Sequence, residues 1–179
     1  MFTPLGAPQR FQVVDVDTVP GRTIATLAQQ KSIAELERSV LGTSALINET
    51  LTRIGFFKRA IDEAPGADTT LAHRVRILEN ELRDARESLT GDPTLARRNE
   101  ATPPALQGRL QGAIGNAWTS SLSALNPSQQ SQIDLVRREF NGVLARVRQL
   151  VDVDLKNLEQ AAEAAGVAWT SGRIPRSPD

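Results

Sequence analysis

The chain has 179 residues, 40% hydrophobic and 23% charged, a composition typical of one soluble globular domain. Its 21 basic and 21 acidic residues cancel and only 4% of residues are aromatic, which excludes a strongly basic or base-stacking surface for nucleic acid. The lack of cysteine excludes disulfides and thiol chemistry, and no apolar run approaches the roughly 20 residues that a transmembrane helix requires.

A single β-strand is predicted at Phe11–Asp17, where β-branched residues are concentrated. It belongs to an extended lead-in over residues 1–21, which ends in a proline–glycine turn. One strand cannot pair its own backbone groups. Either it lies on the helices as an edge, or its sheet belongs to a preceding β-domain from which the chain has been cut, and we favour the second. Phe11 and Val13 are then candidate contacts with a β-rich partner.

Two helices follow, joined by a tight connection at residues 64–67. The first, about Arg22–Glu63, carries apolar residues in a three- and four-residue alternation typical of bundle packing. Its predicted core seam is Ile33, Leu36, Val40, Thr43, Ile47, Thr50, Ile54, Phe57 and Ile61. The second begins at the capping residue Asp68 and ends near Leu89, with the seam Leu71, Val75, Leu78, Leu82, Ala85 and Leu89.

A long irregular stretch over residues 92–104 separates these helices from a third, for which Thr102 is the predicted cap. The third helix has a weaker seam through Leu106, Leu110, Ile114 or Ala113, Ala117, and Leu122 or Ser121. Gly108, Gly112 and Gly115 form a stripe along it. Because glycine costs helix propensity, we expect these glycines, like Gly42 and Gly55 of the first helix, where a neighbouring backbone comes close.

The last helix is predicted from Asn126, an N-cap residue followed by proline, to Gly166, a C-terminal cap. Its seam is Ile133, Val136, Phe140, Val143, Val147, Val151, Leu155, Leu158, Ala162 and Ala165. Four-residue steps follow one another from Val143 to Leu155. Such a stutter should straighten the supercoil locally.

These elements predict an all-α fold, an antiparallel four-helix bundle over residues 22–166 with two long and two short helices. One isolated β-strand precedes it and an extended tail over residues 167–179 follows it. Short loops should make sequential helices antiparallel. The start of the first helix and the end of the last should then project beyond the short helices as a two-helix stem.

Motifs for catalysis or metal binding are missing from this sequence. His73 is the only histidine and lies off the seam beside Arg74, so neither a di-iron site nor a catalytic triad is supported. No phosphate-binding loop, dinucleotide fingerprint or EF-hand loop occurs. The carboxylate pairs Asp15/Asp17 and Asp152/Asp154 are best interpreted as solvated charge. We therefore expect no enzymatic activity, no metal and no cofactor.

The candidate interface residues lie in the loop and the tail. Arg97 and Arg98, with Arg173 and Arg176 in the tail, can hold an anion, but we favour pairing with Asp92, Glu100 or helix ends. Trp118 and Trp169 are large amphipathic aromatics of the kind that anchors protein contacts, although core packing is the interpretation that we favour for them.

Three segments resemble a known family: residues 91–104 (GDPTLARRNEATPP), the segment around Trp118, and residues 165–175 (AGVAWTSGRIP). They are similar to the C-terminal helical region of large bacterial sortilin-like proteins, whose sialidase-type (BNR, Asp-box) β-propellers are often labelled glycosyl hydrolases. The resemblance implies that Phe11–Asp17 is the last strand of a β-sandwich-like segment. No Asp-box (Ser-x-Asp-x-Gly-x-Thr-Trp) occurs here, so no hydrolase residue is carried over.

The resulting hypothesis is a non-enzymatic docking or assembly module. It would be the tail domain of a larger exported propeller protein, periplasmic or extracellular, or a subunit of a larger complex. Its partner would be a β-rich domain or protein, with homo-oligomers as a further option and neither nucleic acid nor membrane insertion. Two alternatives remain open: an accessory glycan-binding domain of a glycosyl hydrolase, with Arg97, Arg98 and Trp169 in a cleft, and a cytosolic coiled-coil adaptor.

Overall fold

The computed structural model describes residues 6, 9–12, 24–64, 69–115 and 124–167, and this part of the chain is all-helical. The elements are α1 (Ile24–Asp62), α2 (Thr69–Thr90), α3 (Pro93–Arg97), α4 (Leu106–Ile114), α5 (Pro127–Gln149), the π-helical turn η2 (Leu150–Asp154) and α6 (Leu155–Ala164). Among the described residues no helix combines the length and hydropathy needed to cross a membrane.

The predicted strand is not found where the structure can be read. Phe11 and Gln12 are irregular, and the rest of the predicted strand, residues 13–17, lies outside the described residues. Phe11 is 87% exposed, so it packs on none of the helices. The physical reason is that a strand must pair its backbone groups with a second strand, and none occurs among the described residues.

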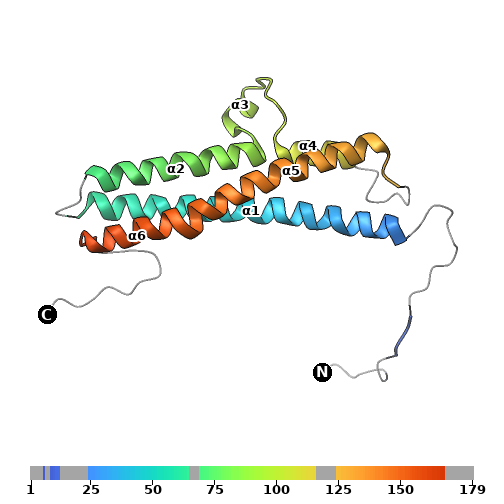
Figure 1. Cartoon of the computed structure of the whole chain (residues 1–179), viewed down its shortest axis with the longest axis horizontal. Coiled ribbons are helices and arrows are strands. Elements are labelled where there is room, and N and C mark those ends of the chain that lie inside the picture. Colours follow the sequence, from blue (N-terminus) through green and yellow to red (C-terminus); the bar gives the residue numbers. More distant parts are fainter. Residues whose placement is uncertain (1–5, 7–8, 13–23, 65–68, 116–123, 168–179) are drawn as a thin grey trace.

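The described helices form three rods (Figure 1). One rod is α1, and a second is the continuous run α5–η2–α6, called here the α5–α6 rod. The third consists of α2 and α4, which lie end to end. The chain leaves α2 at Gly91 and returns at Ala105, whose Cβ lies 3.6 Å from where a Cβ on Gly91 would be. α4 therefore continues in the direction of α2.

This arrangement corrects the predicted antiparallel four-helix bundle and its two-helix stem. Arg137 on α5 donates to Ser32 on α1 at 2.9 Å, and Arg53 of α1 pairs with Glu159 of α6. Both contacts join residues about equally far along their rods, so α1 and the α5–α6 rod run parallel. The prediction failed because it took each connection as a reversal, whereas residues 92–104 leave the axis of α2 and return to it.

The core follows the predicted seams closely. Every predicted seam residue of α1 and α2 is buried, including the two threonines, Thr43 and Thr50. Each threonine hydroxyl donates to the backbone carbonyl four residues earlier, at 2.8 Å. Its polar group is therefore hydrogen-bonded although it is buried. In α4 the buried residues are Leu106, Leu110 and Ile114; the other predicted positions, 117, 121 and 122, lie outside the described residues.

The α5–α6 rod departs from its predicted seam at Val143, Val151 and Ala165, and Val143 is half-buried rather than buried. Leu150 is buried at 1% exposure, whereas the predicted Val151 is only half-buried. The π-helical turn starts here, and Leu155 N–H donates to the Leu150 carbonyl, five residues earlier. At the end of the rod Ala165 is exposed and Val167 is buried instead. The π-turn lies inside the stretch from Val143 to Leu155 that carries the predicted stutter, and the local straightening of the supercoil stays a prediction.

The predicted caps of the last helix are confirmed. The Asn126 side chain accepts from Gln129 N–H at 2.8 Å, and the Gln129 side chain accepts from Asn126 N–H at 3.1 Å. Gly166 adopts a left-handed φ of 77°, and Val167 N–H then reaches the Ala162 carbonyl at 3.0 Å. The predicted Thr102 cap is wrong: α4 starts at Leu106, because the two prolines after Thr102 disfavour helical backbone before them.

The expected close approach at the glycines is also wrong. Nothing in the described part of the chain lies within 4 Å of a Cβ added at Gly42, Gly55, Gly108 or Gly112. These glycines point away from the seams, where no rod packs. Gly115 has a different role, because it ends α4 at a φ of 67°.

Candidate interaction surface

A short, fully capped projection interrupts the third rod. We call residues 92–104 the knob; it contains α3 and stands out from the junction of α2 and α4 (Figure 1). The Asp92 carboxylate accepts from Thr94 N–H at 2.7 Å and caps the start of α3. Asn99 takes a left-handed φ of 54°, which lets Glu100 N–H reach the Leu95 carbonyl at 3.2 Å.

α3 was not predicted from the sequence. The signal was present in Asp92-Pro93, which has the same cap-then-proline form as the Asn126-Pro127 pair that was recognised. The hydrogen bond from Thr94 N–H lowers the pKa of the Asp92 carboxyl, so the cap is anionic over the neutral range. The knob is therefore an ordered element built by its own caps.

The knob carries Arg97 and Arg98, which were predicted as interface residues, on its outer side. Both side chains are exposed, and Arg98 forms only a long contact of 3.9 Å with the equally exposed Glu100. Such a surface pair contributes little to stability. Leu95 is the half-buried residue of α3 and lies over the hollow at the base of the knob.

This hollow has a volume of about 600 Å³ and lies between α2, the knob, α4 and α5. An ion pair between Arg109 of α4 and Glu139 of α5 forms part of its wall. The residues that line it are Asp84, Glu87, Ser88, Gly91, Asp92, Leu95, Thr102, Pro103, Pro104, Ala105, Leu106, Arg109, Glu139 and Val143.

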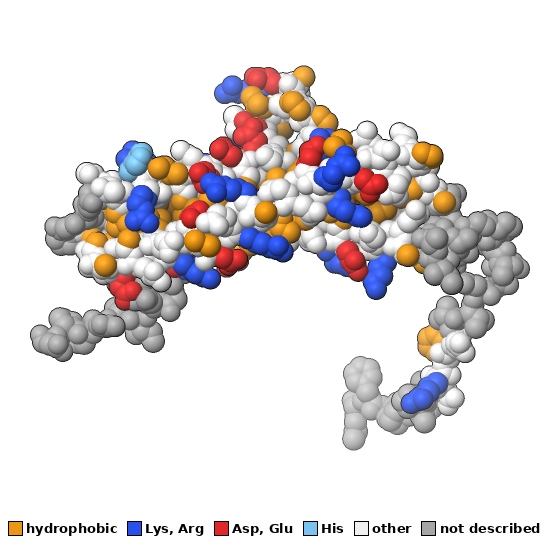
Figure 2. Space-filling view, viewed as in Figure 1, with side chains coloured by type: hydrophobic (Ala, Val, Ile, Leu, Met, Phe, Trp, Pro, Cys, Tyr) orange, Lys and Arg blue, Asp and Glu red, His pale blue; other side chains and the backbone are white. Residues whose placement is uncertain are grey.

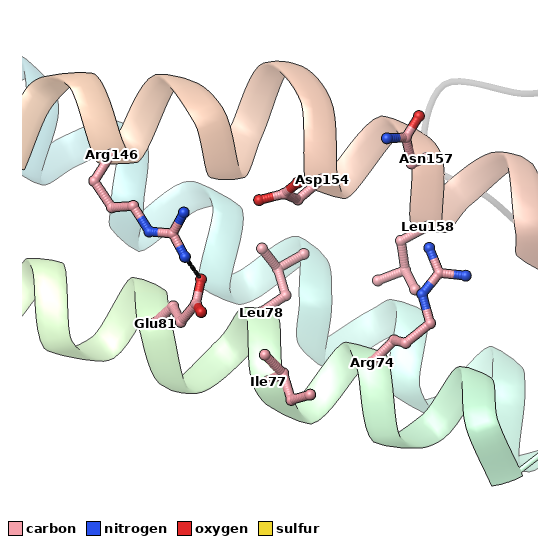
Figure 3. A pocket seen from close by; sticks show the side chains of 8 residues that line it. All are labelled: Arg74, Ile77, Leu78, Glu81, Arg146, Asp154, Asn157 and Leu158. Atoms are coloured by element: carbon pink, nitrogen blue, oxygen red, sulfur yellow. Dashed lines mark hydrogen bonds and ion pairs between the residues drawn. The ribbon is translucent and has the colours of Figure 1, made fainter.

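A second hollow, of about 230 Å³, lies at the opposite end of α2 beside the π-helical turn (Figure 3). Leu78 and Leu158 are apolar at its base, and Asp154 reaches it from the last residue of the π-turn. Gln149 donates to the Asp154 carboxylate at 3.2 Å. Arg146 reaches across from the α5–α6 rod to an ion pair with Glu81 on α2.

A third hollow, of about 370 Å³, joins the other two. It shares Glu81 and Arg146 with the hollow at the π-turn, and Asp84, Ser88 and Val143 with the hollow under the knob. The three hollows follow one another with shared walls, and we call them together the α2–α5 groove. Figure 2 shows hydrophobic side chains between α2 and the α5–α6 rod, with acidic and basic side chains along both edges.

The groove carries an excess of negative charge. Its ionisable lining residues are the carboxylates Glu81, Asp84, Glu87, Asp92, Glu139 and Asp154 and the guanidiniums Arg74, Arg109 and Arg146. Arg109 and Arg146 are already paired with two of the carboxylates, Glu139 and Glu81. The remaining carboxylates face one cation, Arg74, so the unpaired surface is acidic.

The structure brings few of the predicted site residues together. Arg97 and Arg98 lie next to each other on the knob, and Phe11 is far from any described partner. Val13, Trp118, Trp169 and Arg173 lie outside the described residues. Among the residues that are described, no cluster of three or more metal-ligating side chains occurs, and His73 is exposed.

The groove itself was not predicted from the sequence. The charges on its α2 wall are mixed in sign, and mixed charge without periodicity gives no signal for a binding surface. A usable hint was Ile77, an apolar residue off the predicted seam that proves to be 45% exposed in the groove. Exposed apolar side chains inside a concave surface are typical of contact sites.

Comparisons of the chain with protein-family models, with curated proteins and with solved structures find no match. The resemblance to the helical region of sortilin-like proteins therefore stays a prediction. The α2–α5 groove and the knob are the features from which a function can be proposed.

Proposed function

We propose that the chain is a docking or assembly module that performs no chemistry of its own, with the α2–α5 groove and the knob as its docking surface. The observation that carries this proposal is a groove with apolar side chains at its base that ends at a projecting, separately capped element. Such a concave surface with exposed apolar groups and a polar rim has the anatomy of a protein contact site.

The knob supports this proposal because it contributes little to the fold that carries it. A five-residue helix is far too short to be stable by itself, and α3 has no buried residue. Its two caps, at Asp92 and Asn99, hold the segment in one conformation all the same. An element that is ordered in advance loses less entropy on binding, which favours a role in contact with a partner.

The partner that the resemblance suggests is a β-rich domain or protein. In that setting the chain would be the tail domain of a larger exported propeller protein, periplasmic or extracellular, or one subunit of a larger complex. Homo-oligomers are a second possibility within the same proposal. The non-enzymatic role follows the sequence prediction and is part of the proposal.

A photo-crosslinking amino acid placed at Ala96 on the knob tests this function in an extract of the source organism. The matched control is the same amino acid at Asn48, an exposed position on α1. We expect one dominant crosslinked partner at Ala96 and none at Asn48, together with co-elution of the partner in size-exclusion chromatography. A monomer that crosslinks equally poorly at both positions would contradict the proposal.

The glycan-binding alternative is favoured by one observation, the two adjacent exposed arginines, Arg97 and Arg98, above a hollow of about 600 Å³. Binding on a glycan array that is lost in the double variant Arg97→Ala/Arg98→Ala would support it. Trp169→Ala tests the predicted aromatic contribution from the tail. Protein crosslinks without glycan binding would leave the docking proposal as the better account.

A further inference from the structure

The hollows of the α2–α5 groove repeat along α2 with a fixed spacing. The hollow at the π-turn is lined by Arg74, Ile77, Leu78 and Glu81, and the middle hollow by Glu81, Asp84, Ala85 and Ser88. Each set has the spacing i, i+3, i+4, i+7, and the second set is the first moved along by seven residues. The hollow under the knob continues this series past the end of α2 with Ser88, Gly91, Asp92 and Leu95.

Four residues at this spacing form the hole that receives one side chain in helix–helix packing. Holes seven residues apart on a helix are separated by two turns, about 10.5 Å. An incoming helix repeats its side chains at that same distance. An extended strand advances about 3.3 Å per residue and alternates its faces, so it cannot present side chains at every hole. The groove therefore fits a helix better than a strand.

The opposite wall agrees with a helical occupant. Glu139, Gly142, Val143 and Arg146 of α5, which line the middle hollow and the hollow under the knob, also have the spacing i, i+3, i+4, i+7. Nothing in the described part of the chain lies within 4 Å of a Cβ added at Gly142, so an incoming backbone can come close at this point.

The negative charge of the groove indicates which side chains should lie beside the apolar residues of the incoming helix. Asp84 and Glu87 are exposed on one edge and form no ion pair with another described residue. Asp154 faces the groove from the other rod. The ion pair between Arg146 and Glu81 spans the groove but is exposed, and a pair of that kind contributes little. A lysine or arginine of the occupant can replace Arg146 as the partner of Glu81.

We propose that the α2–α5 groove binds a basic amphipathic helix of another polypeptide, about 18 residues long, with apolar residues at seven-residue spacing and lysines or arginines beside them. The length follows from residues 74–91, which run along α2 to the residue just after its end, at about 1.5 Å each or roughly 26 Å, with the knob closing one end. This inference rests on the proposed docking function, and it assigns the groove a helical segment of the partner rather than a strand. The bound helix would take the position of a fourth rod beside the three that the chain supplies.

The test measures binding of a fluorescein-labelled synthetic 18-residue peptide to the full chain by fluorescence anisotropy. The peptide has leucines at seven-residue spacing with lysines on both flanks, and the control peptide has glutamates in place of the lysines. We expect the lysine peptide to bind with a Kd at least about tenfold below that of the glutamate peptide. Equal binding of the two peptides would overturn the proposal.

Two variants test whether the lysine peptide binds in the groove. The double variant Asp84→Lys/Glu87→Lys should weaken binding of the lysine peptide at least about tenfold. Its control, Glu35→Lys/Glu49→Lys, makes the same change of charge on exposed positions of α1 and should leave binding unchanged. Gly142→Leu fills the middle hollow and should also abolish binding while the fold is kept, which circular dichroism checks. Equal loss in the α1 control, or full binding by Gly142→Leu, would contradict a helix in this groove.

The same variants separate this inference from the proposed function. If the peptide fails to bind but Gly142→Leu removes the crosslinks formed at Ala96, docking at the groove stands and the basic helix is the wrong partner. If Gly142→Leu binds no peptide and keeps those crosslinks, the groove has a helix site distinct from the contact at the knob. If the crosslinks at Ala96 never form while the peptide binds, the proposed docking role of the knob fails alone.

Discussion

The two long rods run parallel through the molecule and bury similar seams, but they differ by one residue. The buried residues of α1 from Ile33 to Ile61 alternate strictly in steps of three and four. With the half-buried Val143 included, the α5–α6 rod keeps the same alternation from Ile133 to Leu150, then takes a single step of five to Leu155, and resumes it.

The difference shows how a helix absorbs an extra residue without losing its register. In a regular helix an added residue rotates everything after it by about 100°, away from the core. The π-turn at 150–154 takes up that rotation locally, so Leu155 and Leu158 return to the seam. The displaced residues are pushed outward, with Val153 at 42% exposure and Asp154 in the groove. One wall of the groove is thus a consequence of the extra residue.

The largest expected effect on stability comes from deleting one residue in each of the two rods. Deletion of the exposed Asn48 should rotate Ile54, Phe57 and Ile61 out of the core, with a loss of more than about 5 kcal/mol of unfolding free energy. Deletion of Val153 should turn the π-turn into regular helix at a cost below about 1 kcal/mol. Urea unfolding followed by circular dichroism measures both. Similar losses in the two rods would show that the π-turn is not the place of the extra residue.

Cavity-forming substitutions sharpen the comparison. Ile54 and Leu155 are both fully buried, one in each of the two rods. Ile54→Ala should cost about 4 kcal/mol, because the regular helix around it cannot collapse into the cavity. Leu155→Ala should cost about 2–3 kcal/mol, since the wider π-turn beside it can relax. If chemical unfolding shows that Leu155→Ala loses as much unfolding free energy as Ile54→Ala or more, the π-turn is as rigid as α1.

Matched glycines test the outer faces of the rods. Gly42 of α1 and Gly142 of α5 are both helical, and both have open space where a Cβ would stand. Each substitution to alanine should raise the unfolding free energy by about 0.5–1 kcal/mol, because alanine has the higher helix propensity. A destabilising result at Gly42 alone would show that its face is packed against a neighbour, as the sequence analysis had expected. Thermal or denaturant unfolding of the two variants gives the answer.

The smallest effect concerns the polar contact that holds α1 to α2. Hydrogen bonds from Lys58 at 2.8 Å and Arg83 at 2.6 Å lower the pKa of the Glu79 carboxyl below its ordinary value of 4.5. A carboxyl whose pKa is lowered by folding stabilises the fold above its unfolded pKa and loses that contribution as the pH falls through its folded pKa. Glu79→Gln should therefore cost about 0.5–1 kcal/mol at pH 7 and nothing in strong acid.

The measurement for Glu79 is the unfolding free energy between pH 7 and pH 3. Glu87→Gln is the matched control, because it alters an exposed carboxylate of the same helix outside any described ion pair. The difference between the two variants should vanish toward the acid end. A Glu79→Gln cost that stays constant across the range would show that the contact is steric rather than ionic.

The sequence alone determined the parts of the fold that depend on local spacing. Apolar residues three and four apart must share one face of a helix, so the seams of α1 and α2 were predicted residue by residue. Caps are equally local, since they satisfy backbone groups within three residues, and Asn126 and Gly166 were found in this way. Of the candidate site, the same reasoning reached only Arg97 and Arg98, as charged residues in a proline-rich loop.

Only the tertiary structure decided how the rods are arranged and what lies between them. Whether a connection reverses the chain depends on the path of its backbone, and the knob returns α4 to the axis of α2 instead of reversing it. The groove is formed by the outward sides of α2 and α5, which are separated by more than 30 residues of chain and acquire a common shape only when both pack on α1. Periodicity specifies the buried face of each helix, whereas the neighbour on its exposed side is a property of the assembled bundle.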